Sequence, residues 1–159
     1  MLKEFEQVIK SNQGRLRYIA SRYCSNGDVD DLYQDILLQL WRSFNSFEGQ
    51  ASRATWVYKV ALNTACTYVK KAVKHNALKQ QIANIRPPIC EPAQNNCQAE
   101  LLNTFMNELN DIDASLLMMY LDGLSSEASA EVVGISANAV RARIKRIKAT
   151  FENQYVGAE

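Results

Sequence analysis

The last predicted helix of the chain separates its apolar and cationic residues. Apolar side chains recur at steps of four, three and four, which is the spacing of one face of an α-helix, at Val140, Ile144, Ile147 and Phe151. The overlapping segment 141–148, RARIKRIK, contains five cations in eight positions. A helix of this kind must bury one face against other elements and present the other to water or to an anionic partner.

The residues before this helix predict a helix-turn-helix. Ala130 is small enough for close helix packing, Gly134 can adopt the left-handed conformation that ends a helix, and Ser136 can cap the next one. Ile135 is expected to pack into the core. The alternative is an isolated amphipathic helix whose cations keep it soluble or hold it on a membrane surface. The preceding short helix and turn favour DNA binding.

Charge is segregated along the chain, although the formal net charge is only +1. Residues 36–86 carry net +7, residues 87–131 carry net −8 without any Lys or Arg, and residues 132–159 carry net +3. Each basic segment could be a solvated face. Two basic surfaces separated by an acidic segment also suit two contacts on one extended polyanion.

Helical periodicity dominates the 159 residues, and no segment alternates as a strand does. We expect helices over roughly 3–24 (with Gly14 as a point of breakage or kinking), from an Asp28 cap, from a Ser52 cap to about Lys74, over 98–109, over 113–121, and from Ser136. Pro87 and Pro88 end any helix that precedes them. We therefore predict an all-α fold with two small helical domains, residues 1–75 and 99–159, joined by a flexible linker over 76–98.

Several classes of function are disfavoured. No apolar run is long enough to span a membrane and no signal peptide is evident, so we expect no membrane insertion and a cytoplasmic location. One histidine and four scattered cysteines do not supply a metal site, although Cys90 and Cys97 leave a redox role open. The sequence has no phosphate-binding glycine loop and no nucleophile motif, so we expect no catalytic residue and no cofactor.

Two blocks of the sequence resemble one known family. Residues 28–71 resemble region 2 of bacterial sigma factors, in the extracytoplasmic-function (ECF) group of the sigma-70 family. The matching residues are Asp31-Leu32-x-Gln34-Asp35, Leu40-Trp41, Phe47-x-Gly49, Thr55-Trp56-x-Tyr58 and Ala61-x-Asn63. Residues 121–151 resemble region 4 of the same group, and the blocks follow the family's order.

The resemblance implies a protein without catalytic activity that binds core RNA polymerase and promoter DNA. It also implies an anti-sigma factor as a partner, and a monomer when the chain is free. The alternative is a stand-alone helix-turn-helix regulator, against which the acidic and aromatic residues of 28–56 argue.

The resemblance also assigns roles to individual residues. Contact with the polymerase is expected from Asp31, Gln34, Asp35 and Leu38, although the acids among them could simply stabilise a helix N-terminus. Opened DNA of the −10 element would be bound by Phe47, Gly49, Thr55, Lys59, Asn63 and Lys70. Duplex DNA of the −35 element would be bound by Ser136, Asn138, Arg141, Ala142, Arg143, Lys145 and Arg146, with Ser136 and Arg143 facing phosphates.

Some residues depart from the family pattern. Ala128-Ser129-Ala130 stands where Glu-Ile-Ala is usual, so that Ser129 replaces an apolar residue that packs the first helix of the motif. Ala139 stands where Thr is usual, which removes an expected DNA-proximal hydroxyl. Trp56 is expected to pack in the core, because its spacing with Val60 suits a buried face, although a role in stacking on a base is the alternative.

Overall fold

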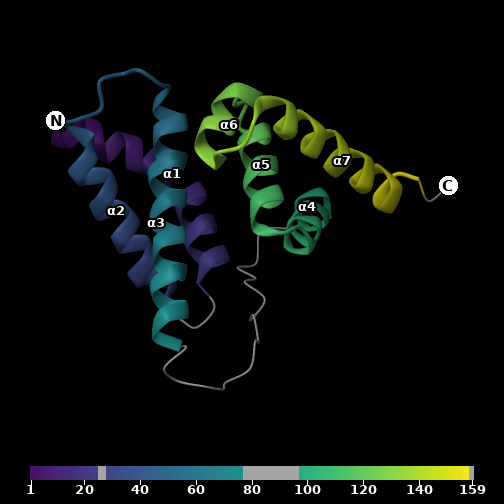
Figure 1. Ribbon diagram of the computed structural model, residues 1–159, viewed down its shortest axis with the longest axis horizontal. Helices are drawn as coiled ribbons and strands as arrows, with labels where there is room; N and C mark the ends of the chain where they lie inside the picture. The colour runs from purple at the N-terminus through teal and green to yellow at the C-terminus, as the bar shows by residue number, and fades with distance from the viewer. Residues whose placement is uncertain (25–27, 77–96, 158–159) are drawn as a thin grey trace. The chain divides into compact units, whose positions relative to one another are not determined.

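The computed structural model describes residues 1–24, 28–76 and 97–157. These residues form seven α-helices and no strand, and the chain divides into two compact units, Met1–Ile89 and Cys90–Glu159 (Figure 1). The predicted all-α fold is confirmed. The predicted linker, 76–98, lies almost wholly outside the described residues, as do Cys90 and most of its surroundings.

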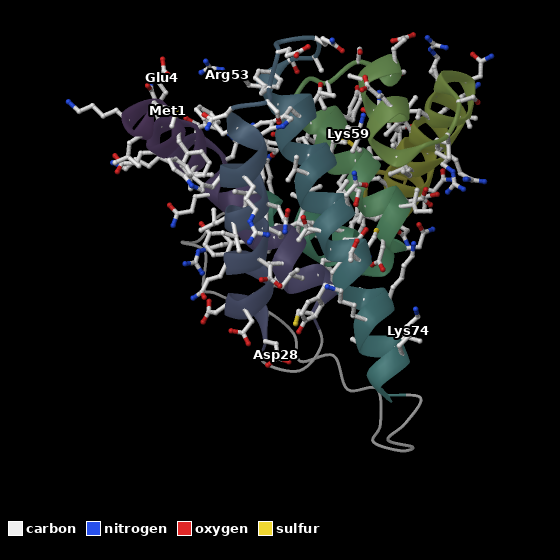
Figure 2. The ribbon with its side chains drawn as sticks, turned by 60° about the vertical axis from the view of Figure 1, so that its left-hand side comes forward. Met1, Glu4, Asp28, Arg53, Lys59 and Lys74 are labelled. Carbon is white, nitrogen blue, oxygen red and sulfur yellow. The ribbon has the colours of Figure 1, made fainter. Side chains whose placement is uncertain are left out.

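The first unit is built from three helices, each of which packs against the other two. They are α1 (Leu2–Tyr23), α2 (Val29–Phe44) and α3 (Arg53–Asn76). In Figure 2, Asp28 and Lys74 lie toward one end of this unit and Arg53 toward the other, so α2 and α3 run in opposite directions. The fully buried side chains come from all three helices and include Leu16, Ile19, Leu32, Ile36, Leu40 and Tyr58.

Helix α1 continues through Gly14, so the helix break expected there does not occur. Gly14 is exposed, while Leu16 and Ile19 in the next turn are at most 2% exposed. A mid-helix glycine costs only about 1 kcal/mol, and burial of two large apolar side chains outweighs that cost.

Asp28 precedes α2 as expected, but its side chain makes no capping hydrogen bond. The carboxylate instead accepts a 3.4 Å hydrogen bond from the Tyr68 hydroxyl, which also accepts a contact from the Cys24 thiol at 3.7 Å. Burial raises the pKa of the Tyr68 phenol, and the Cys24 contact raises it further. The three groups connect the end of α1 and the start of α2 to α3.

Trp56 packs within an aromatic cluster, but Trp56 and Val60 are half-buried, so they lie at the edge of the core and not inside it as their spacing predicted. The centroid of the Trp56 ring lies 6.1 Å from that of Phe44 and 5.2 Å from that of Phe47. The ring centroid of Phe5 lies 5.3 Å from that of Phe44 and 5.0 Å from that of Trp41. The cluster therefore joins α1, α2, α3 and the segment between α2 and α3.

The second unit contains α4 (Cys97–Glu108), α5 (Asp111–Leu121), α6 (Ser126–Val133) and α7 (Ala137–Tyr155). Helices α5, α6 and α7 pack against one another. The apolar stripe of α7 faces inward: Val140, Ile144 and Ile147 are at most 8% exposed, and Phe151 contacts Phe105 of α4 with 5.1 Å between ring centroids. Ser129 is 3% exposed, so the position where the sequence departs from the family pattern is indeed internal.

Candidate nucleic-acid and polymerase interfaces

The turn between α6 and α7 has the geometry that its sequence predicted. Gly134 ends α6 at φ 79°, and its backbone N–H donates to the Ala130 carbonyl at 2.8 Å. The Ser136 hydroxyl then accepts from the Ala139 backbone N–H at 3.2 Å and caps α7. Ser125 caps α6 in the same manner. Together these contacts fix the directions of both helices of the helix-turn-helix.

The outer side of α7 is exposed along the residues expected to bind DNA. Within the described residues, Lys145 and Arg146 form no ion pair and are both exposed. Arg141 is also exposed, but it is held by two partners: its guanidinium donates to the Asn138 side-chain oxygen at 2.9 Å and to the Glu127 carboxylate of α6. The basic segment therefore contains both unpaired and pre-oriented cations.

Arg143 lies differently from its neighbours, since only 33% of its side chain is exposed. It donates a 2.8 Å hydrogen bond to Oδ1 of Asp113, whose side chain is 11% exposed. The other carboxylate oxygen of Asp113 accepts from the Asn110 side chain at 2.8 Å. The contact that the structure gives Arg143 is thus internal, between α5 and α7, whereas the sequence suggested a phosphate-facing side chain.

One edge of α2 carries the residues expected to contact the polymerase. Asp31, Gln34 and Asp35 are exposed, and Leu38 follows one turn later with 44% of its surface exposed. Trp41, 38% exposed, lies one further turn along the same side. The edge therefore changes from acidic to apolar along the helix.

The expected −10 residues occupy the segment before α3 and one side of α3. Phe47 is half-buried against Trp56, and Gly49 is exposed with a φ of 71°. Lys59, Asn63 and Lys70 are exposed at steps of four and seven along α3, and Figure 2 shows Lys59 and Lys74 on this helix.

Thr55 differs from the other −10 residues because it is only 3% exposed. Its hydroxyl lies 2.8 Å from the Ser52 hydroxyl, which also accepts from the Thr55 backbone N–H at 3.1 Å and caps α3 as predicted. In this structure Thr55 is therefore placed to fix the segment before α3 rather than to touch a base.

Comparison with known families places both units in one family. Residues 8–75 match Sigma-70 region 2, and residues 99–151 match Sigma-70 region 4. Together the two matches cover most of the chain, in the family's order, and each falls within one of the two compact units. The chain belongs to the sigma-70 family.

Relatives and solved structures agree with this assignment. This sigma factor is 26% identical to the ECF RNA polymerase sigma-E factor of Haemophilus influenzae, over 96% of the chain and 87% of that protein. Its identity to the sigma-E factor of Escherichia coli K12 is also 26%, over 96% of the chain and 86% of that protein. These matches extend over nearly the whole length of the chain.

Two solved structures share the fold. The sigma factor RpoE of Bartonella quintana, solved in complex with the anti-sigma factor NepR, aligns with a TM-score of 0.73 at 19% identity, covering 99% of both chains. CnrH, solved in complex with the cytosolic domain of CnrY, aligns with a TM-score of 0.62 at 18% identity, covering all of this chain and 92% of that one.

The structure of the sigma factor adds site residues that its sequence did not reveal. Glu127 and Asp113 pair with cations of α7, and Tyr120 of α5 accepts a hydrogen bond from Lys148 and lies under its ammonium group, 4.1 Å from the ring centroid. Each pair joins residues from 14 to 30 positions apart, and no local sequence pattern encodes such a contact.

The described residues contain neither a membrane-spanning helix nor a group of metal ligands. None of the helices within 1–24, 28–76 and 97–157 is both long and apolar enough to cross a membrane. Within the same ranges, no three or more His, Cys, Asp or Glu residues are grouped in a way that could hold a metal ion.

Proposed function

We propose that this sigma factor binds core RNA polymerase and directs it to promoters through a separate surface on each unit. The proposal rests on one observation: each family match lies within one of the two units, and each unit has an exposed polar or basic face. In this proposal residues 1–75 form the region 2 domain, residues 76–98 the linker, and residues 99–159 the region 4 domain.

The exposed edge of α2 is proposed as the polymerase contact. The carboxylates of Asp31 and Asp35 can pair with cations of a partner, and the Gln34 amide can donate and accept hydrogen bonds. Leu38 adds an exposed apolar side chain at the end of the polar residues. A polar rim beside an apolar centre is the usual composition of a protein–protein interface.

The side of α3 that carries Lys59, Asn63 and Lys70 is proposed to bind opened DNA of the −10 element, together with the segment around Phe47 and Gly49. Cations hold the phosphates of a single strand, while an aromatic surface or pocket holds an unstacked base. Thr55 supports this site by holding the start of α3, through its contact with Ser52.

The outer side of α7 is proposed to read the −35 element in the major groove of duplex DNA. Arg141 can bond to the acceptors of guanine, and Lys145 and Arg146 can hold phosphates or bases. Asn138 and Ala142 are exposed on the same helix, and Ser136 stands at its N-terminus, where backbone N–H groups favour phosphate. Arg143 is proposed to act indirectly, by holding α7 to α5.

An anti-sigma factor is proposed as the regulatory partner. Of the two solved structures named above, one is a complex of a sigma factor with an anti-sigma factor, and the other is a complex of CnrH with the cytosolic domain of CnrY. No catalytic role is proposed for the chain itself. A protein that works with RNA polymerase on promoter DNA acts in the cytoplasm, and the free chain is proposed to be a monomer.

Co-purification with core polymerase, followed by transcription from genomic DNA, tests the proposal. We expect the protein to co-purify and to start transcription at sites that share upstream sequence elements. Replacement of both Asp31 and Asp35 by Ala should weaken co-purification by about tenfold, since interface charges carry roughly this share of affinity. A matched removal of two charges, by replacement of the exposed Glu6 and Glu152 with Ala, should not weaken it.

Two outcomes would contradict the proposal. The first is failure to co-purify under conditions in which a known sigma factor does. The second is tight, sequence-specific binding of duplex DNA by the free protein together with no effect on transcription starts, which is the behaviour of a stand-alone regulator.

A further inference from the structure

The cations of α7 differ in what holds them, and Arg141 is the one that is fixed from two helices. Its Nη1 donates to Asn138, one turn earlier on α7, at 2.9 Å, and its Nη2 donates to the carboxylate of Glu127 on α6. Glu127 and Arg141 are 14 residues apart, so only the packing of α6 on α7 brings them together. All three residues are exposed, which places the guanidinium at the surface and not in the core.

A guanidinium fixed in this way suits the reading of a base. Arg has five N–H donors in a rigid fork, and two of its nitrogen atoms are engaged by one acceptor each, so three donors remain for DNA. A flexible Arg loses much side-chain entropy when it docks in one geometry, whereas a pre-oriented one has lost part of it already. Pre-orientation strengthens only contacts that need one geometry, such as a bidentate contact with guanine.

The same carboxylate opposes binding to DNA in general. A negative charge beside a polyanion weakens binding to every sequence, because phosphates repel it. An acid at this place therefore lowers the affinity for all sequences alike, while it supports the geometry of one specific contact. Only the support of Arg141 changes the ratio between specific and non-specific binding, because a charge that weakens binding to every sequence alike cancels from that ratio.

We infer that Glu127 is a positioning residue that sets the −35 specificity of this sigma factor by orienting Arg141 for base recognition. The inference rests on the proposed function, because it assumes that α7 reads the −35 element. Glu127 also lies in the first turn of α6, where any carboxylate stabilises the helix N-terminus. The test must therefore separate orientation of Arg141 from stability and from charge.

The experiment uses holoenzyme formed from core polymerase and the full chain. The DNA probe is a duplex library that keeps a mapped start site and −10 element and is randomised over the −35 hexamer. Sequencing of bound and unbound DNA gives the enrichment of the preferred hexamer over the library mean. The variants are Glu127→Gln, Glu127→Asp and Arg141→Ala, each alone, and Glu127→Gln combined with Arg141→Ala, with Glu152→Gln as a matched loss of charge at an exposed position farther along α7.

We expect Glu127→Gln and Glu127→Asp each to lower the enrichment by about three- to tenfold, a fraction of what a good base contact provides. Glu127→Asp keeps the charge but shortens the side chain, so its loss of enrichment reports orientation. Glu152→Gln should leave the enrichment unchanged. In the Arg141→Ala background, Glu127→Gln should lower the enrichment no further, because its effect passes through Arg141.

Two results would overturn the inference: enrichment unchanged by both Glu127 variants while Arg141→Ala lowers it, or an equal loss from Glu127→Gln with and without Arg141. Circular dichroism melting of each variant checks that α6 remains folded, and Glu127→Asp retains the helix-stabilising charge if Glu127→Gln does not fold. If wild-type holoenzyme enriches no hexamer at all, the proposed function fails instead, so the two failures are distinguishable.

Discussion

The pair formed by Asp113 and Arg143 predicts that one cation of α7 contributes to stability and not to DNA affinity. Replacement of Arg143 by Met keeps most of the aliphatic volume and removes the charge. The Asp113 carboxylate, in a residue that is 8% exposed, then keeps its Asn110 contact but loses the 2.8 Å hydrogen bond on its other oxygen. Removal of a partner from a buried charge costs more than the pair contributes, because the charge is left without compensation.

The magnitude follows from how deeply the pair is buried. A hydrogen bond to a charged group contributes about 1.5–3 kcal/mol, and the 33% exposure of the Arg143 side chain lets water replace part of it. We therefore expect a loss of about 2 kcal/mol in the free energy of opening of the second unit, which corresponds to about a 30-fold change in the opening equilibrium. An exposed cation without a partner should contribute less than about 0.5 kcal/mol.

Hydrogen exchange of the full chain provides the assay, because it reports local opening without requiring both units to unfold together. The backbone amides of Ile144 and Ile147, on the buried face of α7, should exchange about 30-fold faster in Arg143→Met than in the wild type. The control is Arg146→Met, which removes the same charge from an exposed position of the same helix. The control should instead lower the salt dependence of promoter binding by about one unit of slope.

The reasoning is refuted if Arg143→Met and Arg146→Met change the exchange of these amides equally. It is also refuted if Arg143→Met lowers the salt slope of promoter binding while leaving exchange unchanged, because Arg143 would then be a phosphate contact. Arg143→Lys should recover part of the protection, since a lysine retains the charge but not the planar fork.

Three further predictions concern the ends of helices and one phenol. Ser125→Ala and Ser136→Ala should each cost about 1 kcal/mol of stability, measured by urea unfolding, because each removes a helix cap. Only Ser136→Ala should also weaken binding to the −35 element. Equal effects of the two variants on DNA binding would contradict the phosphate-facing position of Ser136. Gly134→Ala should cost about 1 kcal/mol in the same assay because φ is 79° there and no neighbouring atom would meet the added Cβ, so a neutral result would show that the turn relaxes. The pKa of Tyr68 is raised above 10.0 in the folded chain, so the unfolded chain loses the phenol proton first as the pH rises. The stability that Tyr68 contributes is therefore present below about pH 10 and lost above it. The stability of Tyr68→Phe should decline less than that of the wild type between about pH 9 and about pH 11, and an identical decline would show that Tyr68 does not contribute.

Much of the second unit was predictable because its determinants are local. The stripe from Val140 to Phe151 has the period of a helix, and Gly134 and Ser136 act on backbone groups within four residues of themselves. Interactions over such short separations depend only on residues that are close together in the sequence, so they can be predicted from it. The same reason explains why Ser52 was identified as the cap of α3.

Local interpretation failed for Asp28, because its partner is distant in the sequence. Asp28 is of a residue type that commonly caps helices, but its carboxylate contacts Tyr68, 40 positions away. A polar side chain such as that of Asp28 has several possible partners, and the packing of helices selects among them. The role of Thr55 in binding DNA stays a prediction; its hydroxyl contacts the nearby Ser52, and 3% of the residue is exposed.

By itself the sequence determined the helices, the helix-turn-helix and the segments that carry positive charge, because periodicity, caps and composition are properties of neighbouring residues. Only the tertiary structure decided what each cation does. Arg143 lies against Asp113 of α5, Arg141 is held by Glu127 of α6, and Lys145 and Arg146 form no ion pair with any described residue. The energy of a charge depends on its burial and on the groups around it, and both are set only when the helices pack together.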